Sequence, residues 1–436
     1  MSKLSNFMFR TGALAAAAVA MAGPAFAEDA PAPVLNSGDT AWMLTSTALV
    51  LLMTIPGLAL FYGGMVRKKN VLATLMHSFA ITCLVTVIWV VVGFSLAFSK
   101  GESDYIGNFD QFMLAGIGVA DLWAPLNIPT SVFMIFQMTF AIITPALITG
   151  AFAERMKFSA LLWFTGLWSI LVYSPVCFWV WGGGFLGGAG VLDFAGGTVV
   201  HINSGIAGLV AAIMIGKRKG YGVENLAPHN VTLTLIGGSL LWVGWFGFNA
   251  GSAGAANGAA GMAMVVTQIA TAGAALAWMF VEWMTHRKPT VLGVVSGAVA
   301  GLVAITPAAG FVTPAGALAI GVIAGVVCFW GAAWLKPKFK YDDALDVFAV
   351  HGLGGITGAI LTGVFAAEAI GGKVGVLEGN IAQLWLQIEG VAVTLIWSGV
   401  CTAILLFIID KTIGLRVESD AESEGLDINQ HGEMVH

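Results

Sequence analysis

The chain has 436 residues, of which 58% are hydrophobic and only 10% are charged, and its formal net charge is −5. Soluble domains carry about 25% charged and about 45–50% apolar residues, so this composition excludes a water-soluble protein and indicates several membrane-spanning helices. The first element in chain order has a basic start, the apolar run GALAAAAVAMAG, and the small residues AFA before Glu28. This pattern predicts a secretory signal peptide over residues 1–27, the alternative being a retained but short first anchor.

Eleven further segments are apolar and about 18–25 residues long, which is the length a helix needs to cross the hydrocarbon core of a bilayer. We therefore expect an all-α integral membrane protein with a membrane domain over 28–410 and a C-terminal tail over 411–436. The predicted spans are 41–64, 72–98, 128–151, 158–181, 197–216, 231–251, 260–284, 290–307, 314–335, 346–366 and 384–410.

Basic residues fall almost entirely on one side of this predicted topology. If the mature N-terminus lies outside, 15 of the 19 lysines and arginines lie in inside loops or in the tail. Two lie outside, at Lys100 and Lys373, and the other two belong to the signal peptide. Because cytoplasmic loops carry an excess of Lys and Arg, the sequence predicts N-outside and C-inside.

Two histidines occupy the same local sequence frame in the two halves of the chain. Both His201 and His351 begin the pattern H-x-x-x-G-I-x-G, and they lie 150 residues apart, on the fifth and tenth predicted spans. Since five is odd, the two halves have opposite orientations in the membrane. This indicates two inverted five-helix repeats plus a final helix, with a shared site near the midplane.

Histidines inside a bilayer are costly unless they face the interior of the protein and find a partner. A single histidine is readily explained as a structural residue bonded to the backbone, but a symmetric pair favours a role in a pathway. A metal site would need further ligands, and neither segment supplies an HExxH motif or another His/Cys cluster. Two neutral imidazoles can bond to each other and still offer polar edges to a small solute.

The stretch DFAGGTVVHINSGIAGLVAA, which begins at Asp193, resembles the signature of the ammonium transporter (Amt/Mep/Rh) family, in its bacterial AmtB-like branch. The resemblance covers essentially the whole mature chain. It continues through GLALFYGGMVRKKNVL at 57–72, WFGFNAGSAG at 245–254, DDALDVFAVHG at 342–352 and GLRVESDAESEGLD at 414–427.

The resemblance implies a homotrimer in the inner (plasma) membrane with one ammonium-conducting pore per subunit and no cofactor. It places an outer site for the ammonium ion at Phe140, Trp181 and Ser252. It also implies a gate of two phenylalanines, Phe140 and Phe248. Below this gate it places a pore lined by His201, His351 and Trp245.

Two aspartates precede the histidine-bearing spans. Asp193 stands before the expected helix start at 196–198, where capping and ordering of the loop is the favoured role. Direct cation binding by this carboxylate, or attraction of cations to the mouth, is the alternative. Asp346 is expected to cap the span at 346–366.

Two other classes of function compete with transport. An ammonium sensor would bind the same ion but signal, and an intramembrane enzyme would need a metal or nucleophile constellation that the sequence does not offer. The acidic tail is too short to fold alone, and we expect it to lie over the basic inside loops. In the family this face binds a trimeric PII signalling protein. The expected partners are therefore ammonium or ammonia, the other subunits, a PII protein and the lipid bilayer, and no nucleic acid.

Overall fold

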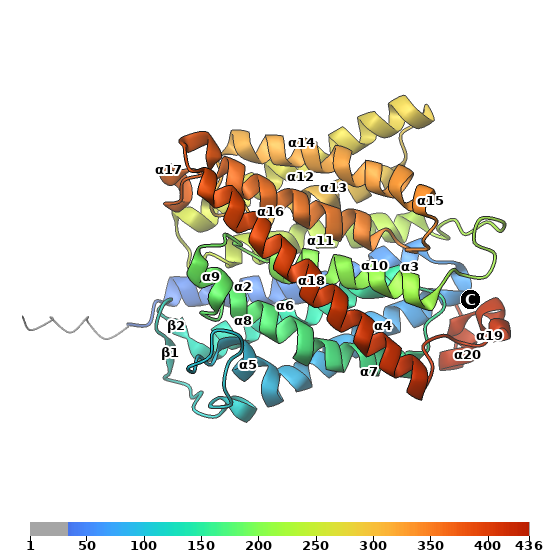
Figure 1. Ribbon diagram of the computed structural model, residues 1–436, viewed down its shortest axis with the longest axis horizontal. Helices are drawn as coiled ribbons and strands as arrows, with labels where there is room; N and C mark the ends of the chain where they lie inside the picture. Colours follow the sequence, from blue (N-terminus) through green and yellow to red (C-terminus); the bar gives the residue numbers. More distant parts are fainter. Residues whose placement is uncertain (1–33, 436) are drawn as a thin grey trace, which may run out of the picture. The chain divides into compact units, whose positions relative to one another are not determined.

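The computed structural model describes residues 34–435, and the unit Leu35–His436 is built almost entirely of helices (Figure 1). The predicted signal peptide over 1–27 lies outside the described residues. Within the described part, ten helices are long and apolar enough to cross a membrane. The predicted span 290–307 coincides with a shorter apolar helix, α13 (Val291–Ile305). The predicted fold class, an all-α integral membrane protein, is thus confirmed.

The first half of the unit contains five long spans, most of which consist of consecutive helical pieces. The first is interrupted at Ile55, where the backbone is not helical, directly before Pro56, which lacks an amide hydrogen. The elements are α2 (Ser37–Leu52), η1 (Met53–Leu58), α3 (Ala59–Met65), η2 (Lys68–Asn70), α4 (Val71–Ile88), η3 (Trp89–Gly93), α5 (Phe94–Phe98), η4 (Phe112–Leu114), β1 (Leu122–Trp123), β2 (Ile128–Pro129), α6 (Thr130–Ile148), η5 (Thr149–Phe152), α7 (Phe158–Trp168), η6 (Ser169–Tyr173), α8 (Ser174–Val180), α9 (Phe185–Ala189), η7 (Gly197–Ile202) and α10 (Asn203–Ile215). The two short strands pair antiparallel, with Leu122 opposite Pro129.

The second half repeats this plan and ends in one long helix and two short ones. Its elements are α11 (Val231–Gly251), α12 (Gly258–His286), α13, α14 (Pro314–Trp330), η8 (Gly331–Leu335), α15 (Lys336–Phe339), η9 (Phe348–Gly352), α16 (Leu353–Phe365), α17 (Glu368–Gly371), η10 (Val376–Glu378), α18 (Ile381–Thr412), α19 (Ser419–Glu424) and α20 (Leu426–His431). Figure 1 shows α18 crossing one face of the bundle obliquely, and it packs against both α10 and α16. The last long helix therefore joins the two halves.

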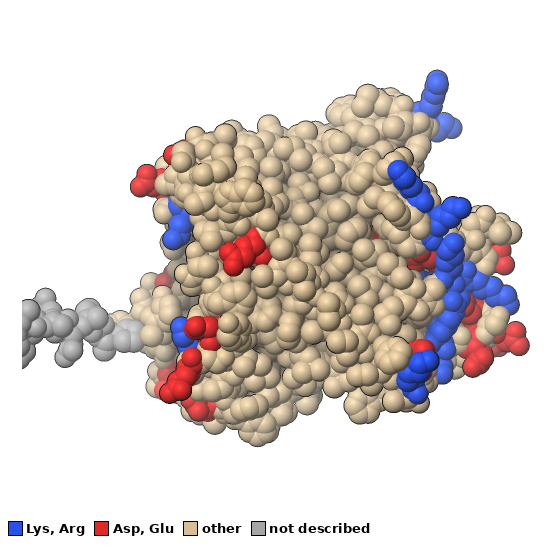
Figure 2. Space-filling model, in the orientation of Figure 1, with Lys and Arg blue, Asp and Glu red and all other residues tan. Residues whose placement is uncertain are grey.

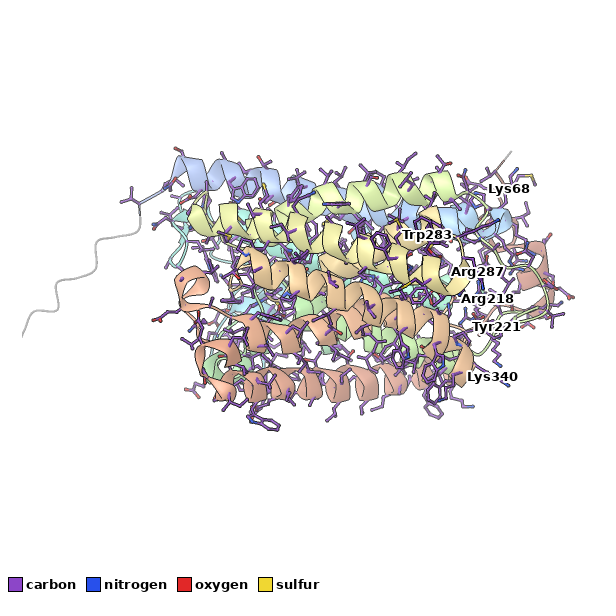
Figure 3. The ribbon with its side chains drawn as sticks, turned by 90° about the horizontal axis from the view of Figure 1, so that it is seen from above. Lys68, Arg218, Tyr221, Trp283, Arg287 and Lys340 are labelled. Atoms are coloured by element: carbon purple, nitrogen blue, oxygen red, sulfur yellow. The ribbon has the colours of Figure 1, made fainter. Side chains whose placement is uncertain are left out.

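Lysines and arginines gather at the end of the bundle where α19 and α20 lie (Figure 2). In the view turned by 90°, this end carries the labelled residues Lys68, Arg218, Tyr221, Arg287 and Lys340 (Figure 3). The opposite end of the face shown in Figure 2 has few of these blue side chains. The bundle is thus polarised along the direction of its long helices.

The acidic tail is folded and packs on the loops at this basic end. Asp427 is buried, and its carboxylate accepts hydrogen bonds from the backbone N–H groups of Leu72 (3.0 Å) and Ala73 (2.8 Å) at the start of α4. Glu422 accepts from the backbone of Lys219 (2.6 Å) and pairs with Arg416 (2.7 Å). These contacts place the tail on the loops that the sequence predicted it would cover.

Candidate functional site

The two histidines approach each other because their helices cross with almost no space between the backbones. His201 lies in η7 and His351 in η9, and each of these π-helical turns leads into a 13-residue α-helix, α10 or α16. A Cβ atom on Gly205 would lie only 2.2 Å from the backbone nitrogen of Gly352. Only glycine fits such a contact, which explains why the repeated sequence frame contains this residue.

This crossing brings the two imidazoles together in the interior. The Nδ1 atoms of His201 and His351 lie 3.3 Å apart, and the rings stack with centroids 5.3 Å apart. The two residues are only 1% and 3% exposed. If both rings are neutral, one Nδ1 donates to the other, so the pair presents one donor and one acceptor at its Nε2 atoms. Nε2 of His201 has no hydrogen-bond partner among the described residues.

Trp245 completes the wall beside the histidines. Its ring stacks on His201 at a centroid distance of 5.3 Å, and its Nε1 donates to the hydroxyl of Thr306 (2.8 Å). That bond fixes the plane of the indole and uses its single polar group. Trp245 therefore presents an apolar face toward His201.

Two phenylalanines lie on the other side of this group. Phe140 of α6 and Phe248 of α11 stack with ring centroids 4.2 Å apart, and both are essentially unexposed. The ring of Phe248 also lies 6.0 Å from that of His201. The aromatic pair and the histidine pair thus form one continuous series of rings, closed in this conformation.

A cavity of about 110 Å³ lies next to the phenylalanine pair. Trp181 and Ser252 both line it, and the indole of Trp181 meets Phe140 edge-on at 5.8 Å. The Ser252 hydroxyl donates its hydrogen to the carbonyl of Phe248 (2.8 Å), so its oxygen remains able to accept. Phe140 itself does not line this cavity.

Three residues of α6 that line this cavity, Phe133, Phe136 and Gln137, were not predicted from the sequence. Oε1 of Gln137 is buried without a partner among the described residues. Residues three and four positions apart share one face of a helix. The placement of Phe140 near the mouth was therefore the signal that could have found Phe136 and Gln137.

Asp193 caps the first histidine-bearing helix. Its carboxylate accepts hydrogen bonds from four successive backbone N–H groups at 2.7–3.1 Å. These four donors are Gly196, Gly197, Thr198 and Val199. The backbone carbonyl of Asp193 accepts from Nε1 of Trp181 at 2.9 Å. One residue thus holds both the start of η7 and the indole of the outer cavity.

The expectation that the side chain of Asp346 caps the second histidine-bearing helix is wrong. The carboxylate that accepts from the backbone N–H groups of Val347 (3.1 Å) and Phe348 (2.8 Å) belongs to Asp343. Asp346 has a positive φ of 59°, and its carboxylate pairs with Lys336 instead. Asp343 follows Asp193 by 150 residues, the same spacing as the two histidines, so the repeat itself was the missed signal.

No group of three or more His, Cys, Asp or Glu residues within 34–435 is arranged to hold a metal ion. The arrangement consists instead of a small outer cavity, a closed aromatic pair and a buried imidazole pair. Such a series of neutral groups suits the passage of a small solute.

Comparisons with known proteins match the chain to one family. The model of the Ammonium Transporter Family matches residues 41–436. An ammonium transporter of Aquifex aeolicus is 52% identical over 402 residues, which cover 92% of this chain and 94% of that protein. An ammonium transporter of Bacillus subtilis is 51% identical over 404 residues, with 92% and 99% covered.

Solved structures agree with the sequence comparisons. The crystal structure of Mep2 from Candida albicans has a TM-score of 0.83 at 34% identity and covers 88% of this chain and 87% of its own. A sensor Amt protein has a TM-score of 0.84 at 30% identity and covers 90% of this chain and 98% of its own. The family is one of transporters and channels, not of enzymes. The chain therefore belongs to the ammonium transporter family.

Proposed function

We propose that the chain carries ammonium across the inner membrane by binding the ion outside, removing its proton, and passing neutral ammonia along the two histidines. The observation that carries this proposal is the series formed by the outer cavity, the Phe140–Phe248 pair and the His201–His351 pair. The family supports ammonium transport as such. The assignment of these residues to the steps is our own.

Recognition of the ion begins at the outer cavity. The face of Trp181 attracts a cation by roughly 0.5–2 kcal/mol, and the Ser252 oxygen can accept one N–H bond. Phe140 does not line the cavity but packs edge-on behind Trp181, between this site and Phe248. These groups favour a small cation over water without supplying a countercharge that would trap it.

Loss of the proton follows from the dry interior. An ion carried bare into an apolar medium costs tens of kcal/mol by Born estimates, whereas ammonia is neutral and can bond through N–H groups and one lone pair. Potassium has no proton to release, so the Phe140–Phe248 pair excludes it. The imidazoles replace part of the hydration shell of ammonia, and we propose that the proton crosses by a separate route.

The orientation of the chain follows from its charges. The basic end of the bundle, which carries the tail, is assigned to the cytoplasm, and the outer cavity then faces the other side. This assignment agrees with removal of residues 1–27 as a signal peptide. We propose a homotrimer in which each subunit has its own pore, as the family resemblance implies.

The test is a current measurement on a solid-supported membrane that bears purified protein. An ammonium pulse should produce a transient current that an equal potassium pulse does not, and His201→Ala should abolish that discrimination. Ammonium uptake without current would leave only electroneutral conduction of ammonia. Absence of both uptake and current would overturn the proposed function.

A sensor function is the second candidate, because a sensor Amt protein is among the similar structures. The two functions differ in flux, since a sensor needs occupancy of the site but no passage through it. Binding of ammonium without uptake in the same vesicles would favour the sensor.

The folded tail supports a regulatory partner at the cytoplasmic end. Lys69 donates to the backbone carbonyl of Ser423, and Lys219 donates to its hydroxyl (2.7 Å), so basic loops and tail form one surface. We propose that a trimeric PII signalling protein binds this surface and closes the inner mouths of the pores when nitrogen is plentiful.

A pull-down from membranes of nitrogen-starved cells, before and after an ammonium shock, tests this partner. The PII protein should co-purify with the intact chain after the shock, and much less with a chain that ends at Arg416. Equal binding to both chains, or no binding to either, contradicts the proposal.

A further inference from the structure

The last long helix carries a buried glutamine that bonds to both histidine-bearing halves. Gln387 lies on α18 and is 1% exposed. Its Oε1 accepts from the backbone N–H of Leu192 (2.7 Å), and its Nε2 donates to the carbonyl of Leu192 (2.8 Å) and to that of Ala359 (3.0 Å). The side-chain amide thus uses both of its hydrogens and its oxygen on the backbones of two separate segments.

The bonds to Leu192 act directly on the outer end of the pore. The carbonyl of Leu192 belongs to the peptide plane that leads into Asp193. From Asp193 project both the carboxylate that caps η7 and the carbonyl that accepts from Trp181. A side-chain amide that bonds to both the N–H and the carbonyl of Leu192 therefore fixes the positions of two groups of Asp193. These are the carboxylate that caps η7 and the carbonyl that accepts from Trp181.

The bond to Ala359 reaches the other half. Ala359 lies on α16, eight residues after His351, and the preceding Gly358 packs against the backbone of Ala304, where a Cβ would meet the carbonyl oxygen at 2.2 Å. This part of α16 therefore has little freedom to shift. Gln387 bonds the Asp193 loop to the firmly packed part of the helix that carries the second histidine.

A packing role would need only an apolar side chain of the same size. A polar side chain inside a membrane protein is unfavourable unless its groups are paired. Here both donors and the oxygen of Gln387 bond to backbone near the site, and the oxygen also accepts from Nε2 of Gln383 on the same helix (3.3 Å). We propose that Gln387 is a positioning residue for ammonium recognition, which holds the outer site and the two histidines in one fixed arrangement although it belongs to neither repeat. This inference rests on the proposed function.

The substitution that tests it is Gln387→Met, which keeps the volume and removes every polar contact. Loss of two or more buried hydrogen bonds changes a conformational equilibrium roughly tenfold. A smaller population of the ordered outer site then weakens apparent ammonium binding by at most that factor. We expect the half-saturating ammonium concentration of the current to rise up to about tenfold. Potassium competition should increase, and the maximal current should change less.

Thr402→Val is the matched control on the same helix. Thr402 is fully buried and accepts from Nε1 of Trp168 on α7 (3.0 Å), so the variant also loses one cross-helix bond. That bond lies away from the outer mouth. The control should keep the half-saturating concentration and the exclusion of potassium.

Hydrogen exchange tests the positioning role of Gln387 independently of ammonium transport. In Gln387→Met the amides of 196–199 should exchange faster than in the unsubstituted chain, while those of α12 stay protected and show that the variant is folded. Unchanged exchange at 196–199 overturns the positioning role whether or not the chain transports ammonium. The positioning role is also overturned if the chain transports ammonium but Gln387→Met leaves the half-saturating concentration and the exclusion of potassium unchanged. A lack of current in the unsubstituted chain counts against the proposed function alone.

The double variant with Trp181→Leu checks the route of the effect. If Gln387 acts through the Asp193 loop and Trp181, the two substitutions together should raise half-saturation by less than the product of their separate effects. Independent, multiplicative effects contradict this route.

Discussion

The two caps of the histidine-bearing helices have the same position in their repeats but opposite electrostatic surroundings. Asp193 accepts four backbone N–H bonds, and none of the ion pairs formed by residues 34–435 includes it. Asp343 accepts two, and Lys336 donates to its backbone carbonyl while pairing with Asp346. A basic side chain thus accompanies only the second cap.

This difference matches the proposed direction of transport. A negative charge without a basic partner near the outer cavity favours cations there, in addition to its capping role. At the other end Lys336 lies beside Asp343 and Asp346 and offsets part of their negative charge, so the attraction of cations to that end is weakened. The two repeats therefore share a backbone arrangement, but the electrostatic field near their caps differs.

This comparison predicts that substitution by alanine lowers the ammonium current far more at Asp193, the cap near the outer cavity, than at Asp343. Asp193→Ala leaves four buried N–H groups without their charged acceptor, each such bond contributing about 1.5–3 kcal/mol, whereas Asp343→Ala leaves two. We expect the ammonium current to fall at least tenfold in Asp193→Ala and roughly threefold or less in Asp343→Ala. Comparison of initial currents in proteoliposomes with equal protein content is the measurement. Similar losses in both variants would show that the two caps are equivalent.

The histidine pair allows the same comparison inside the pore. His201→Ala or His351→Ala leaves the other imidazole without its partner and lets water enter the dry segment. Ion selectivity should therefore change as much as rate, with the ammonium-to-potassium ratio falling on the order of tenfold, the effect of about 1.4 kcal/mol. An alanine variant with unchanged rate and full potassium exclusion contradicts the pathway.

Loss of the indole at the outer cavity has a smaller, concentration-dependent effect. Trp181→Leu removes a cation–π attraction of roughly 0.5–2 kcal/mol, which acts on occupancy of the site. The current should fall several-fold at low ammonium and recover at high ammonium. A decrease that is equal at all concentrations points to damaged packing instead.

Asp343, the cap of the second histidine-bearing helix, makes the stability of the protein depend on pH. Burial raises the pKa of Asp343 to about 6, with Asp346 adding to the rise and Lys336 opposing it. Because this pKa lies above the unfolded value near 3.8, the folded protein binds the proton more tightly. The contribution of this carboxyl to the free energy of unfolding therefore falls as pH rises from about 4 to 6 and is constant above.

Asp343→Asn removes that titration. The thermal midpoint of the variant, measured relative to that of the unsubstituted protein, should increase by a few degrees between about pH 4.5 and about pH 7. A relative midpoint that is constant or falls over this range contradicts the raised pKa.

The sequence was most informative where a signal is local. Hydropathy located a helix at every predicted span, because a membrane-spanning helix must be apolar along its length. The repeated frame around His201 and His351 identified the buried pair, since inverted repeats place equivalent residues together. Eight residues before each histidine the chain also has an aspartate, Asp193 or Asp343. The predicted cap of the second helix was nevertheless Asp346, which lies nearer to His351.

What was missed depends on contacts between distant segments. Gln387 is one of several polar residues in a mostly apolar helix, and nothing near it in the sequence points to Leu192 or Ala359. Phe136 and Gln137 line the outer cavity only because α6 turns that face inward. The tail buries only a small apolar cluster, Val417, Ala421 and Leu426 with Ala73 of α4, and it also bonds to partners such as Leu72, more than 350 positions earlier.

Asp427 is also the acceptor that completes the start of α4. The N–H groups of Leu72 and Ala73 belong to α4, yet their acceptor lies more than 350 positions later and is made long after them during synthesis. While the ribosome is still translating, this early span stands in the bilayer with its first turn uncapped. A chain that stops short of Asp427 keeps that defect permanently. The first turn of α4 thus depends on a residue hundreds of positions away in the sequence.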